Sequence, residues 1–126
     1  MNSLIDSTLL KSGSYLNGKW ITKAETQADV LNPATGEVIT TLALSNEQDA
    51  KTVIDDANTA FQTWKTTSVQ TRFELLKKWF DLIIANKQDL AAIMTMEQGK
   101  TLAESLGEID YGASYVEWFA EEAKRI

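Results

Sequence analysis

Apolar residues recur at helical spacing through most of this chain, and this periodicity constrains the fold more than any other feature. The first run follows Ser45 and consists of Ala50, Val53, Ile54, Ala57, Ala60, Phe61 and Trp64. Such a stripe is typical of one face of an amphipathic helix. Ser45 and Gln48 have the spacing of a capping box, so we expect this helix to begin at Ser45.

Three more helical segments are predicted beyond a break at residues 66–68. Ser68 can cap the second helix, whose inner face is expected to contain Phe73, Leu76, Trp79, Phe80 and Ile83. A bend near Asn86 separates it from a third helix that ends at Gly99, where a left-handed residue is expected. The range 45–126 is therefore predicted to be helical.

The last helix is predicted to run from about Thr101 to the end of the sequence. Its apolar rhythm consists of Leu102, Leu106, Ile109, Ala113, Val116, Phe119, Ala120 and Ala123. Small residues cluster within it at Gly107, Gly112, Ala113 and Ser114. We expect another backbone to approach closely at this small-residue patch.

Residues 1–44 read as strands and turns. Asn17-Gly18 lies between short runs rich in β-favouring residues and predicts a two-residue hairpin, because a type I′ turn needs positive φ at both central positions. Asn32-Pro33 begins a second turn that Gly36 helps to close. Val38 to Leu42 form a further β-rich run. The fold class expected for this chain is mainly α-helical, with an N-terminal β-hairpin and strands.

Composition excludes several classes of function. The 126 residues suffice for one domain, and 18 acidic against 12 basic residues give a net charge of -6, which disfavours nucleic-acid binding. No apolar run approaches the roughly 20 residues of a membrane helix, and the N-terminus does not resemble a secretory signal. A cytoplasmic location with no membrane partner is expected.

The side chains that most often carry catalysis are missing. The sequence contains no cysteine and no histidine, so it has no thiolate nucleophile, no disulfide and no imidazole base or metal ligand. Carboxylates could still act as acid and base. The candidates are Glu97, Glu104, Glu108, Asp110, Glu117, Glu121 and Glu122, and a solvated acidic face is the simpler interpretation for most of them.

Gly99-Lys100-Thr101 has the ending of a phosphate-binding loop. That loop also needs a glycine five positions before the Gly-Lys pair, where this chain has Met94. The preceding segment is helical and no strand leads into it, so we expect a helix corner instead. The six glycines also lack the G-x-G-x-x-G spacing of a dinucleotide-binding turn.

Large aromatic residues form the last candidate set, comprising Trp64, Phe73, Trp79, Phe80, Trp118 and Phe119. At helical spacing, core packing is their simplest role, and part of the set could belong to an interface.

Four stretches of the sequence, in order, resemble one known family. They are YLNGKWI, LNPATGEVI, AFQTWKTTSVQTRFELLKKW and LAAIMTMEQGKTLAESLGEIDYGASYVEWFAEEAKRI. Together they are similar to the N-terminal part of the aldehyde dehydrogenase superfamily, from about Tyr15 to Ile126. The final run is most like the succinate-semialdehyde dehydrogenase branch.

The resemblance implies an α/β parent fold in which residues 1–126 form the N-terminal part of the coenzyme-binding domain. It implies a cytoplasmic, homo-oligomeric oxidoreductase that uses NAD or NADP to oxidise an aldehyde through a cysteine thiolate. In this branch the aldehyde would be succinate semialdehyde, from 4-aminobutyrate catabolism.

The same resemblance places the catalytic and cofactor-binding residues outside this chain. The family's nucleophilic cysteine, catalytic glutamate, Rossmann segment and substrate-binding arginines all lie further along. We therefore expect no catalytic, cofactor-binding or metal residue here, no bound cofactor, and an inactive, truncated piece. The alternative is a self-standing helical interaction module without enzymatic activity.

One further site is implied by the family. Some members hold a structural monovalent cation with backbone carbonyls near the position of Val30-Leu31 and an acidic side chain that would be Glu108. The simpler alternative is that Glu108 only caps or pairs locally.

Overall fold

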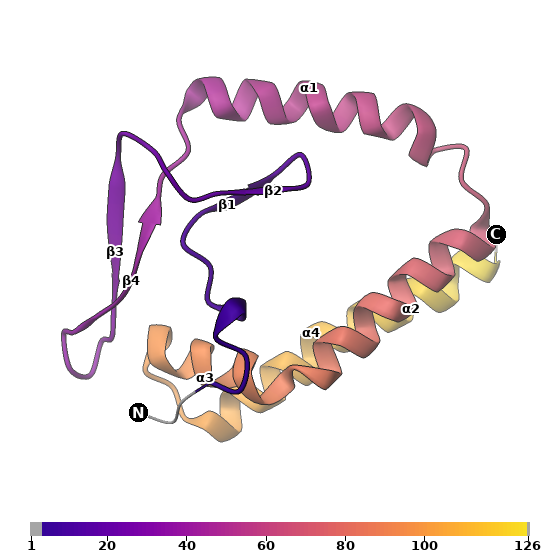
Figure 1. The fold of residues 1–126 in the computed structure, drawn as a ribbon. Coiled ribbons are helices and arrows are strands. Elements are labelled where there is room, and N and C mark those ends of the chain that lie inside the picture. The colour runs from indigo at the N-terminus through magenta and orange to yellow at the C-terminus, as the bar shows by residue number, and fades with distance from the viewer. Residues whose placement is uncertain (1–3, 126) are drawn as a thin grey trace. The chain divides into compact units, whose positions relative to one another are not determined.

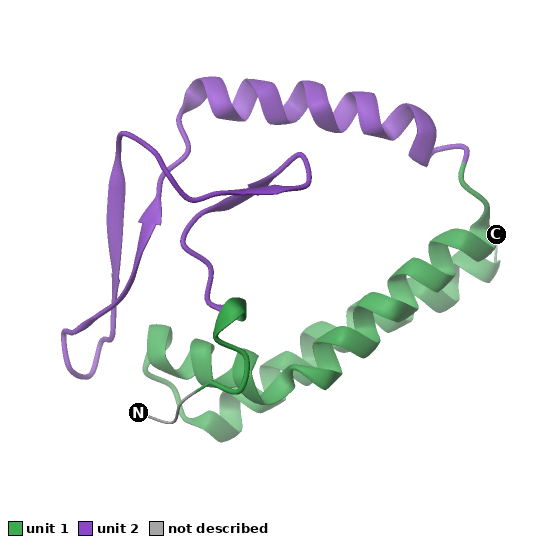
Figure 2. Cartoon of the chain, in the orientation of Figure 1, with its two compact units in different colours: residues 1–9, 67–126 green, residues 10–66 purple. Residues whose placement is uncertain are grey.

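The structure is a computed structural model that describes residues 4–125 (Figure 1). The chain divides into two compact units, residues 1–9 with 67–126 (unit 1) and residues 10–66 (unit 2) (Figure 2). Unit 2 contains the strands and the first helix. Among the described residues, unit 1 contains the remaining three α-helices and a short N-terminal segment.

Unit 2 begins with the hairpin that its sequence predicts. Strands β1 (Ser14–Leu16) and β2 (Lys19–Ile21) pair antiparallel, with Tyr15 opposite Trp20. Asn17 and Gly18 have φ of 44° and 77°, the positive values that a type I′ turn requires. The two aromatic rings lie 5.1 Å apart, so the predicted flanking residues stabilise the hairpin as a cross-strand pair.

A second antiparallel pair follows in unit 2. Strands β3 (Gln27–Leu31) and β4 (Val38–Ala43) run side by side, with an irregularity in register between Val30 and Leu31. The connecting turn begins at Asn32, whose Oδ1 accepts the N–H of Ala34 at 2.9 Å. Gly36 closes it at φ 73° and donates its N–H to the carbonyl of Asn32. The expected turn and strand are confirmed.

Helix α1 (Glu47–Trp64) completes unit 2, but it does not begin where the sequence indicated. The N-cap is Asn46, and Asp49 completes the capping box in place of Gln48. Ser45 instead donates its hydroxyl to Ser14 at 3.0 Å. The prediction of Ser45 was wrong because Asn is an equally good N-cap, and a carboxylate three residues later can accept the Asn46 N–H at 2.9 Å.

The apolar stripe of α1 has little cover from the rest of unit 2. No residue of this helix is buried, and Phe61 and Ile54 are 52% and 66% exposed. Ala43, at the end of β4, is the only buried residue among residues 10–66, all of which the structure describes. Unit 2 is therefore stabilised mainly by its turns, by the hydrogen bonds between its paired strands and by the N-cap of α1.

Unit 1 is built from helices α2 (Val69–Ala85), α3 (Lys87–Gln98) and α4 (Leu102–Glu122). Two short 3₁₀ helices complete it, η1 (Ser7–Leu9) and η2 (Ala123–Arg125). Ser68 caps α2 by accepting the N–H of Thr71 at 3.1 Å, as predicted. Helix α4 packs against both α2 and α3, and α2 and α4 lie side by side for much of their length (Figure 1).

Small residues make the buried contacts of unit 1. Ala91, Ala113 and Ala120 are at most 1% exposed, and Ser105 is completely buried. The expectation of a small-residue patch on α4 was thus wrong in part. A Cβ added at Gly107 or Gly112 would meet no atom within 4 Å, so within this chain the close approach occurs at the buried alanines.

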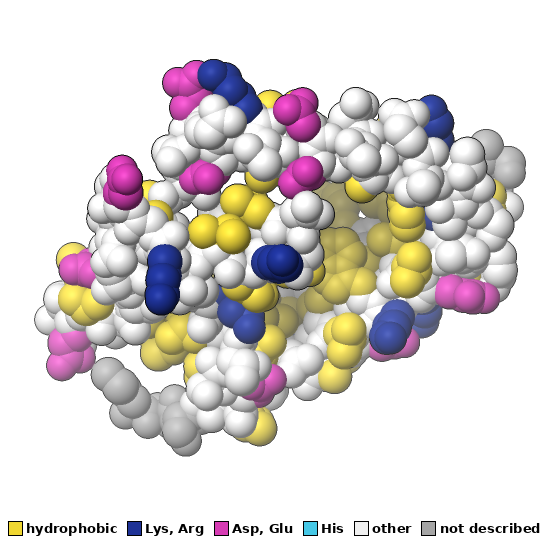
Figure 3. Space-filling model, turned by 45° about the horizontal axis from the view of Figure 1, so that its top comes forward, with side chains coloured by type: hydrophobic (Ala, Val, Ile, Leu, Met, Phe, Trp, Pro, Cys, Tyr) yellow, Lys and Arg dark blue, Asp and Glu magenta, His cyan; other side chains and the backbone are white. Residues whose placement is uncertain are grey.

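Several large apolar residues lie outside this core. Trp79, expected on the inner face of α2, is 56% exposed, because α2 is covered mainly along its contact with α4. Leu75 and Leu82 are about half exposed on the same helix. Hydrophobic side chains are accordingly visible on the surface of the space-filling view (Figure 3).

Candidate functional site

The corner between α3 and α4 contains the Gly99-Lys100-Thr101 tripeptide. Gly99 adopts φ 74° and ψ 5°, and its N–H donates to the carbonyl of Thr95 at 2.9 Å. This left-handed conformation costs glycine little and ends α3. The structure therefore confirms the helix corner predicted from the sequence.

A capping box starts α4 immediately after this corner. The Thr101 hydroxyl accepts the N–H of Glu104, and the Glu104 carboxylate accepts the Thr101 N–H at 3.0 Å and its hydroxyl at 2.8 Å. The hydrogen bonds from the Thr101 hydroxyl and then its N–H lower the pKa of Glu104 from its ordinary value of 4.5, outweighing partial desolvation. Lys100 adds a smaller favourable charge.

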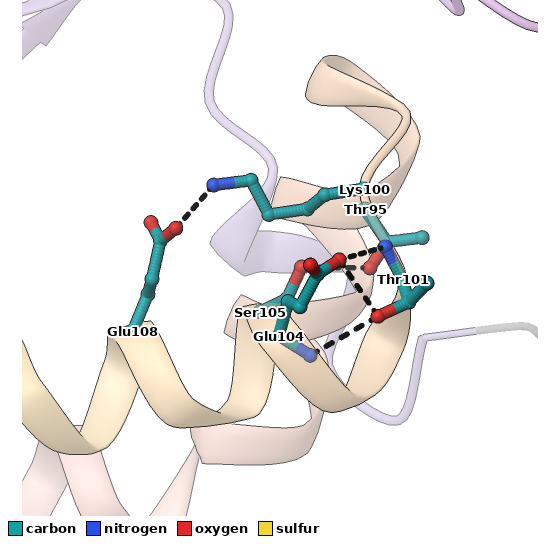
Figure 4. A network of polar contacts seen from close by, with 6 residues as sticks. All are labelled: Thr95, Lys100, Thr101, Glu104, Ser105 and Glu108. Carbon is teal, nitrogen blue, oxygen red and sulfur yellow. Dashed lines mark hydrogen bonds and ion pairs between the residues drawn. The ribbon is translucent and has the colours of Figure 1, made fainter.

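Two further contacts tie the corner together (Figure 4). The hydroxyls of Thr95 on α3 and Ser105 on α4 lie 2.9 Å apart, and Ser105 is fully buried. Lys100 forms an ion pair with Glu108. The Lys100 side chain extends toward Glu108 and away from the capping box (Figure 4). The short loop is thus fixed by groups on both helices.

This geometry leaves the tripeptide unsuited to phosphate binding. The ammonium group of Lys100 is engaged by Glu108, and the hydroxyl of Thr101 serves the helix cap. Gly99 ends a helix, whereas a phosphate loop needs several free N–H groups at the start of one. The corner organises the helices and offers no group for chemistry.

Glu108 is paired, but it is not buried. Its side chain is 51% exposed, and its partner is Lys100. The Glu108 side chain is half exposed because the residue lies on the outer face of α4 and not among the small buried residues.

Four more of the acidic candidates pair with cations. Asp110 contacts Lys87 at 2.6 Å and so links α4 to α3. The remaining contacts are Glu117 with Lys77, Glu121 with Lys124, and Glu122 with Arg125. Exposed pairs of this kind contribute little to stability, and these form no acid–base couple.

Lys77 contacts two carboxylates, those of Asp81 and Glu117. Desolvation works against its charge, but the hydrogen bonds and charges of Asp81 and Glu117 outweigh it and raise the pKa of Lys77. Its ammonium group also lies 4.1 Å from the ring centre of Phe80. This cluster joins α2 to α4 and acts structurally.

An aromatic hollow on α4 was not predicted from the sequence, although Trp118 and Phe119 of its lining are among the aromatic candidates. A hollow of about 380 Å³ is lined by Tyr111, Ser114, Tyr115, Trp118 and Phe119. The two tyrosine hydroxyls lie 2.7 Å apart, and this hydrogen bond raises the pKa of Tyr115, with desolvation adding to the effect. The signal in the sequence was the spacing of four between the tyrosines, which puts both rings on one helix face.

The hollow provides an apolar surface and two hydroxyl groups. Trp118 and Phe119 are each 60% exposed, so large rings are open on this side of α4. Tyrosine hydroxyls can donate and accept hydrogen bonds, and aromatic faces favour apolar partners. The lining contains no nucleophile or acid–base pair suited to neutral pH.

No metal site is apparent in the part of the chain that the structure describes. No group of three or more Asp, Glu, His or Cys residues there is arranged to hold an ion. Val30-Leu31 lies in unit 2 and Glu108 in unit 1, so the family-implied cation site stays a prediction. Among residues 4–125, no helix has the length and apolarity needed to cross a membrane.

Comparison with known proteins decides the family. The model of the aldehyde dehydrogenase family matches residues 20–126. This chain belongs to the aldehyde dehydrogenase family. The resemblance seen in the sequence motifs is thereby confirmed.

Known aldehyde dehydrogenases are similar to this chain in both sequence and backbone structure. The chain is 46% identical to glutarate-semialdehyde dehydrogenase of Pseudomonas putida, and 42% identical to the NADP(+) succinate-semialdehyde dehydrogenase of Escherichia coli. Both matches cover 98% of this chain and 26% of the relative. The crystal structure of aldehyde dehydrogenase from Brucella melitensis biovar abortus 2308 matches with a TM-score of 0.96 and 49% identity, over 100% of this chain and 26% of that one.

The chain thus spans about a quarter of the length of the relatives it matches. The parent fold is that of the aldehyde dehydrogenases, and the described part is mainly helical with two antiparallel strand pairs, as expected.

Proposed function

We propose that this chain is the N-terminal part of the coenzyme-binding domain of an NAD(P)-dependent semialdehyde dehydrogenase, with succinate semialdehyde as the substrate. The main support is the match to semialdehyde dehydrogenases along nearly the whole chain. One of these relatives is named for succinate semialdehyde and NADP(+), and another for glutarate semialdehyde, so the shared feature is a short aldehyde with a carboxyl group at its other end.

The proposed reaction converts the aldehyde, water and NAD(P)⁺ into the carboxylate, NAD(P)H and two protons. A nicotinamide cofactor supplies the hydride acceptor when it is bound. The residues of this chain do not fit such a cofactor, because the glycines lack the dinucleotide spacing and Lys100 is held by Glu108. No step of the reaction is therefore assigned to this chain.

The role proposed for the chain is structural. The sequence lacks the cysteine that the family's chemistry needs, so the isolated piece is inactive. Exposed large residues on α2 and α4, including Trp79 and Trp118, are suited to burial against further protein. Within the parent enzyme, residues 1–126 would support the cofactor-binding sheet, and we propose a cytoplasmic homo-oligomer.

A two-piece reconstitution tests this role. The 126-residue chain is mixed with the segment of the Escherichia coli relative that follows the matched region, and NAD(P)H formation is followed with succinate and glutarate semialdehyde. We expect no turnover from either piece alone and aldehyde-dependent turnover from the pair, faster with succinate semialdehyde. Replacing the catalytic cysteine of the added segment is the matched control and should abolish the signal.

The outcomes separate the parts of the proposal. Turnover by the 126-residue chain alone would contradict its inactivity. Failure of the pair to form a complex would contradict the structural role. A preference for glutarate semialdehyde would contradict only the substrate.

A second candidate function rests on the aromatic hollow of α4. In this alternative, the chain is a helical interaction module that binds an intact dehydrogenase without taking part in turnover. This alternative would be favoured if the chain binds the full-length Escherichia coli enzyme but forms no complex with the segment of that enzyme that follows the matched region.

A further inference from the structure

Asp89 is a buried carboxylate that neither the family's chemistry nor the helix corner uses. It lies in the first turn of α3 and is 7% exposed. Its Oδ1 accepts the N–H of Ile5 at 2.9 Å, and its Oδ2 accepts the N–H of Asp6 at 2.7 Å. One side chain therefore binds two successive backbone groups more than 80 positions away in the sequence.

Comparison with the other helices shows why this carboxylate is available. An acidic residue three positions after the N-cap accepts the N-cap N–H in α1, through Asp49, and in α4, through Glu104. Asp89 has the same position in α3, after Asn86. The N–H of Asn86 already donates to the carbonyl of Leu82, at the end of α2. The local partner of Asp89 is thus taken, and its carboxylate turns to the N-terminal segment.

The N-terminal segment depends strongly on polar attachment. Ile5 is 89% exposed, so its side chain adds little apolar burial, and Leu4 and Leu9 are only partly covered. Asp6 shapes the segment locally by accepting the N–H of Thr8 at 2.9 Å and its hydroxyl at 2.6 Å. Hydrogen bonds to a charged acceptor contribute more than those between neutral groups.

We propose that Asp89 is a clasp that holds residues 4–9, here called the N-terminal strap, against α3 as a separable element of unit 1. Loss of this carboxylate frees the strap while the packing of α2, α3 and α4 persists. The backbone N–H groups carry the contact, so it does not depend on the side chain of Ile5.

Amide hydrogen exchange, followed by NMR on the 126-residue chain, tests the clasp. Asp89→Asn preserves the size of the side chain but removes its charge and one acceptor oxygen. We expect the amides of Ile5 and Asp6 to exchange at least about tenfold faster in this variant. The Gly99 amide, bonded to Thr95 at the end of the same helix, should be unchanged.

Glu97→Gln is the matched control, because it removes the same charge from an exposed position on α3. It should leave exchange at Ile5 and Asp6 as in the wild type. Ile5→Ala is a second variant that should also leave Asp6 protected, since the backbone contact remains. The proposal is overturned if these amides are unprotected in the wild type, if Asp89→Asn has no effect, or if it accelerates Gly99 equally.

Discussion

The two units of this chain are each stabilised internally by different kinds of contact. Unit 1 buries Ala113 and Ala120 of α4, and polar contacts between residues distant in sequence join α4 to α2 and to α3. Unit 2 buries only Ala43 among its residues and relies on its turns, two strand pairs and the cap of α1.

This difference shows which part of the fold depends on tertiary packing. A two-stranded hairpin is marginal by itself, and an amphipathic helix gains most of its stability by burying its stripe. The residues of unit 2 neither support its hairpins with further strands nor bury the apolar stripe of α1. Helix α4, in contrast, packs against α2 and α3. We therefore expect substitutions of buried residues to act mainly on unit 1 and substitutions of turn residues mainly on unit 2.

The largest effect is expected from Ala113→Leu in unit 1. Ala113 is 1% exposed, and a larger side chain there would force α4 away from its neighbours, at a cost of about 1–3 kcal/mol in the free energy of unfolding. Urea unfolding, followed through NMR signals of α4, measures it. Ala103→Leu makes the same change at an exposed position of α4 and should cost much less. Equal losses would contradict tight packing at Ala113.

Gly13→Ala is the corresponding test of unit 2. A Cβ at this position would lie 1.8 Å from the carbonyl oxygen of Ile21, so the backbone beside the β1–β2 hairpin must shift. We expect a loss of about 1–2 kcal/mol, confined to unit 2. Loss of the cross-strand contact between Tyr15 and Trp20 in NMR spectra would report it. A preserved contact would show that the hairpin does not need this glycine.

A matched pair of cap substitutions compares the two units directly. Thr101→Ala and Asn46→Ala each remove a side-chain N-cap and should each cost about 1 kcal/mol of helix stability. The loss at Asn46 should fray α1 visibly, because no packed core holds that helix, while α4 keeps its structure. Helix-specific NMR chemical shifts measure both effects. Equal fraying of the two helices would contradict the difference between the units.

Gly107→Ala should stabilise unit 1 slightly. Its added Cβ meets no atom within 4 Å, and alanine is favoured over glycine in a helix by about 0.5–1 kcal/mol. A higher urea midpoint checks this gain. A lower midpoint would mean that the space beside Gly107 is occupied in solution.

The smallest effect concerns the pH dependence of the α3–α4 corner. The pKa of Glu104 is lowered in the folded state, so its carboxylate contributes stability that is present above pH 4.5 and is lost as pH falls through the lowered pKa. Glu104→Gln should make the melting temperature of unit 1 depend less on pH below pH 4.5 than it does in the wild type. Glu97→Gln is the control and should keep the wild-type slope. An unchanged slope in Glu104→Gln would contradict this contribution.

Local chemistry made much of the fold predictable. The Asn17-Gly18 hairpin, the Ser68 cap and the left-handed Gly99 follow from requirements of a few neighbouring residues, and all three are confirmed. The start of α1 was misjudged by one residue, because Ser45 and Asn46 are both good caps and only the nearby Asp49 decides between them.

Contacts between residues that are distant in sequence could not be predicted from local sequence patterns. Periodicity identifies the apolar stripe of a helix but not the part of it that finds a partner, so the exposure of Trp79 was not foreseen. The attachment of Ile5 to Asp89 gives no sequence signal, because it uses backbone N–H groups. At the candidate site, the helix corner was predictable from Gly99, whereas the pairing of Lys100 with Glu108 needed the fold.

The contrast between the units is tested most directly by amide exchange along α1 and α4 in one sample of the chain. We expect amides in the middle of α4, such as that of Val116, to exchange at least about tenfold more slowly than those in the middle of α1, such as that of Ala57. Equal protection of the two helices, or stronger protection of α1, would contradict it.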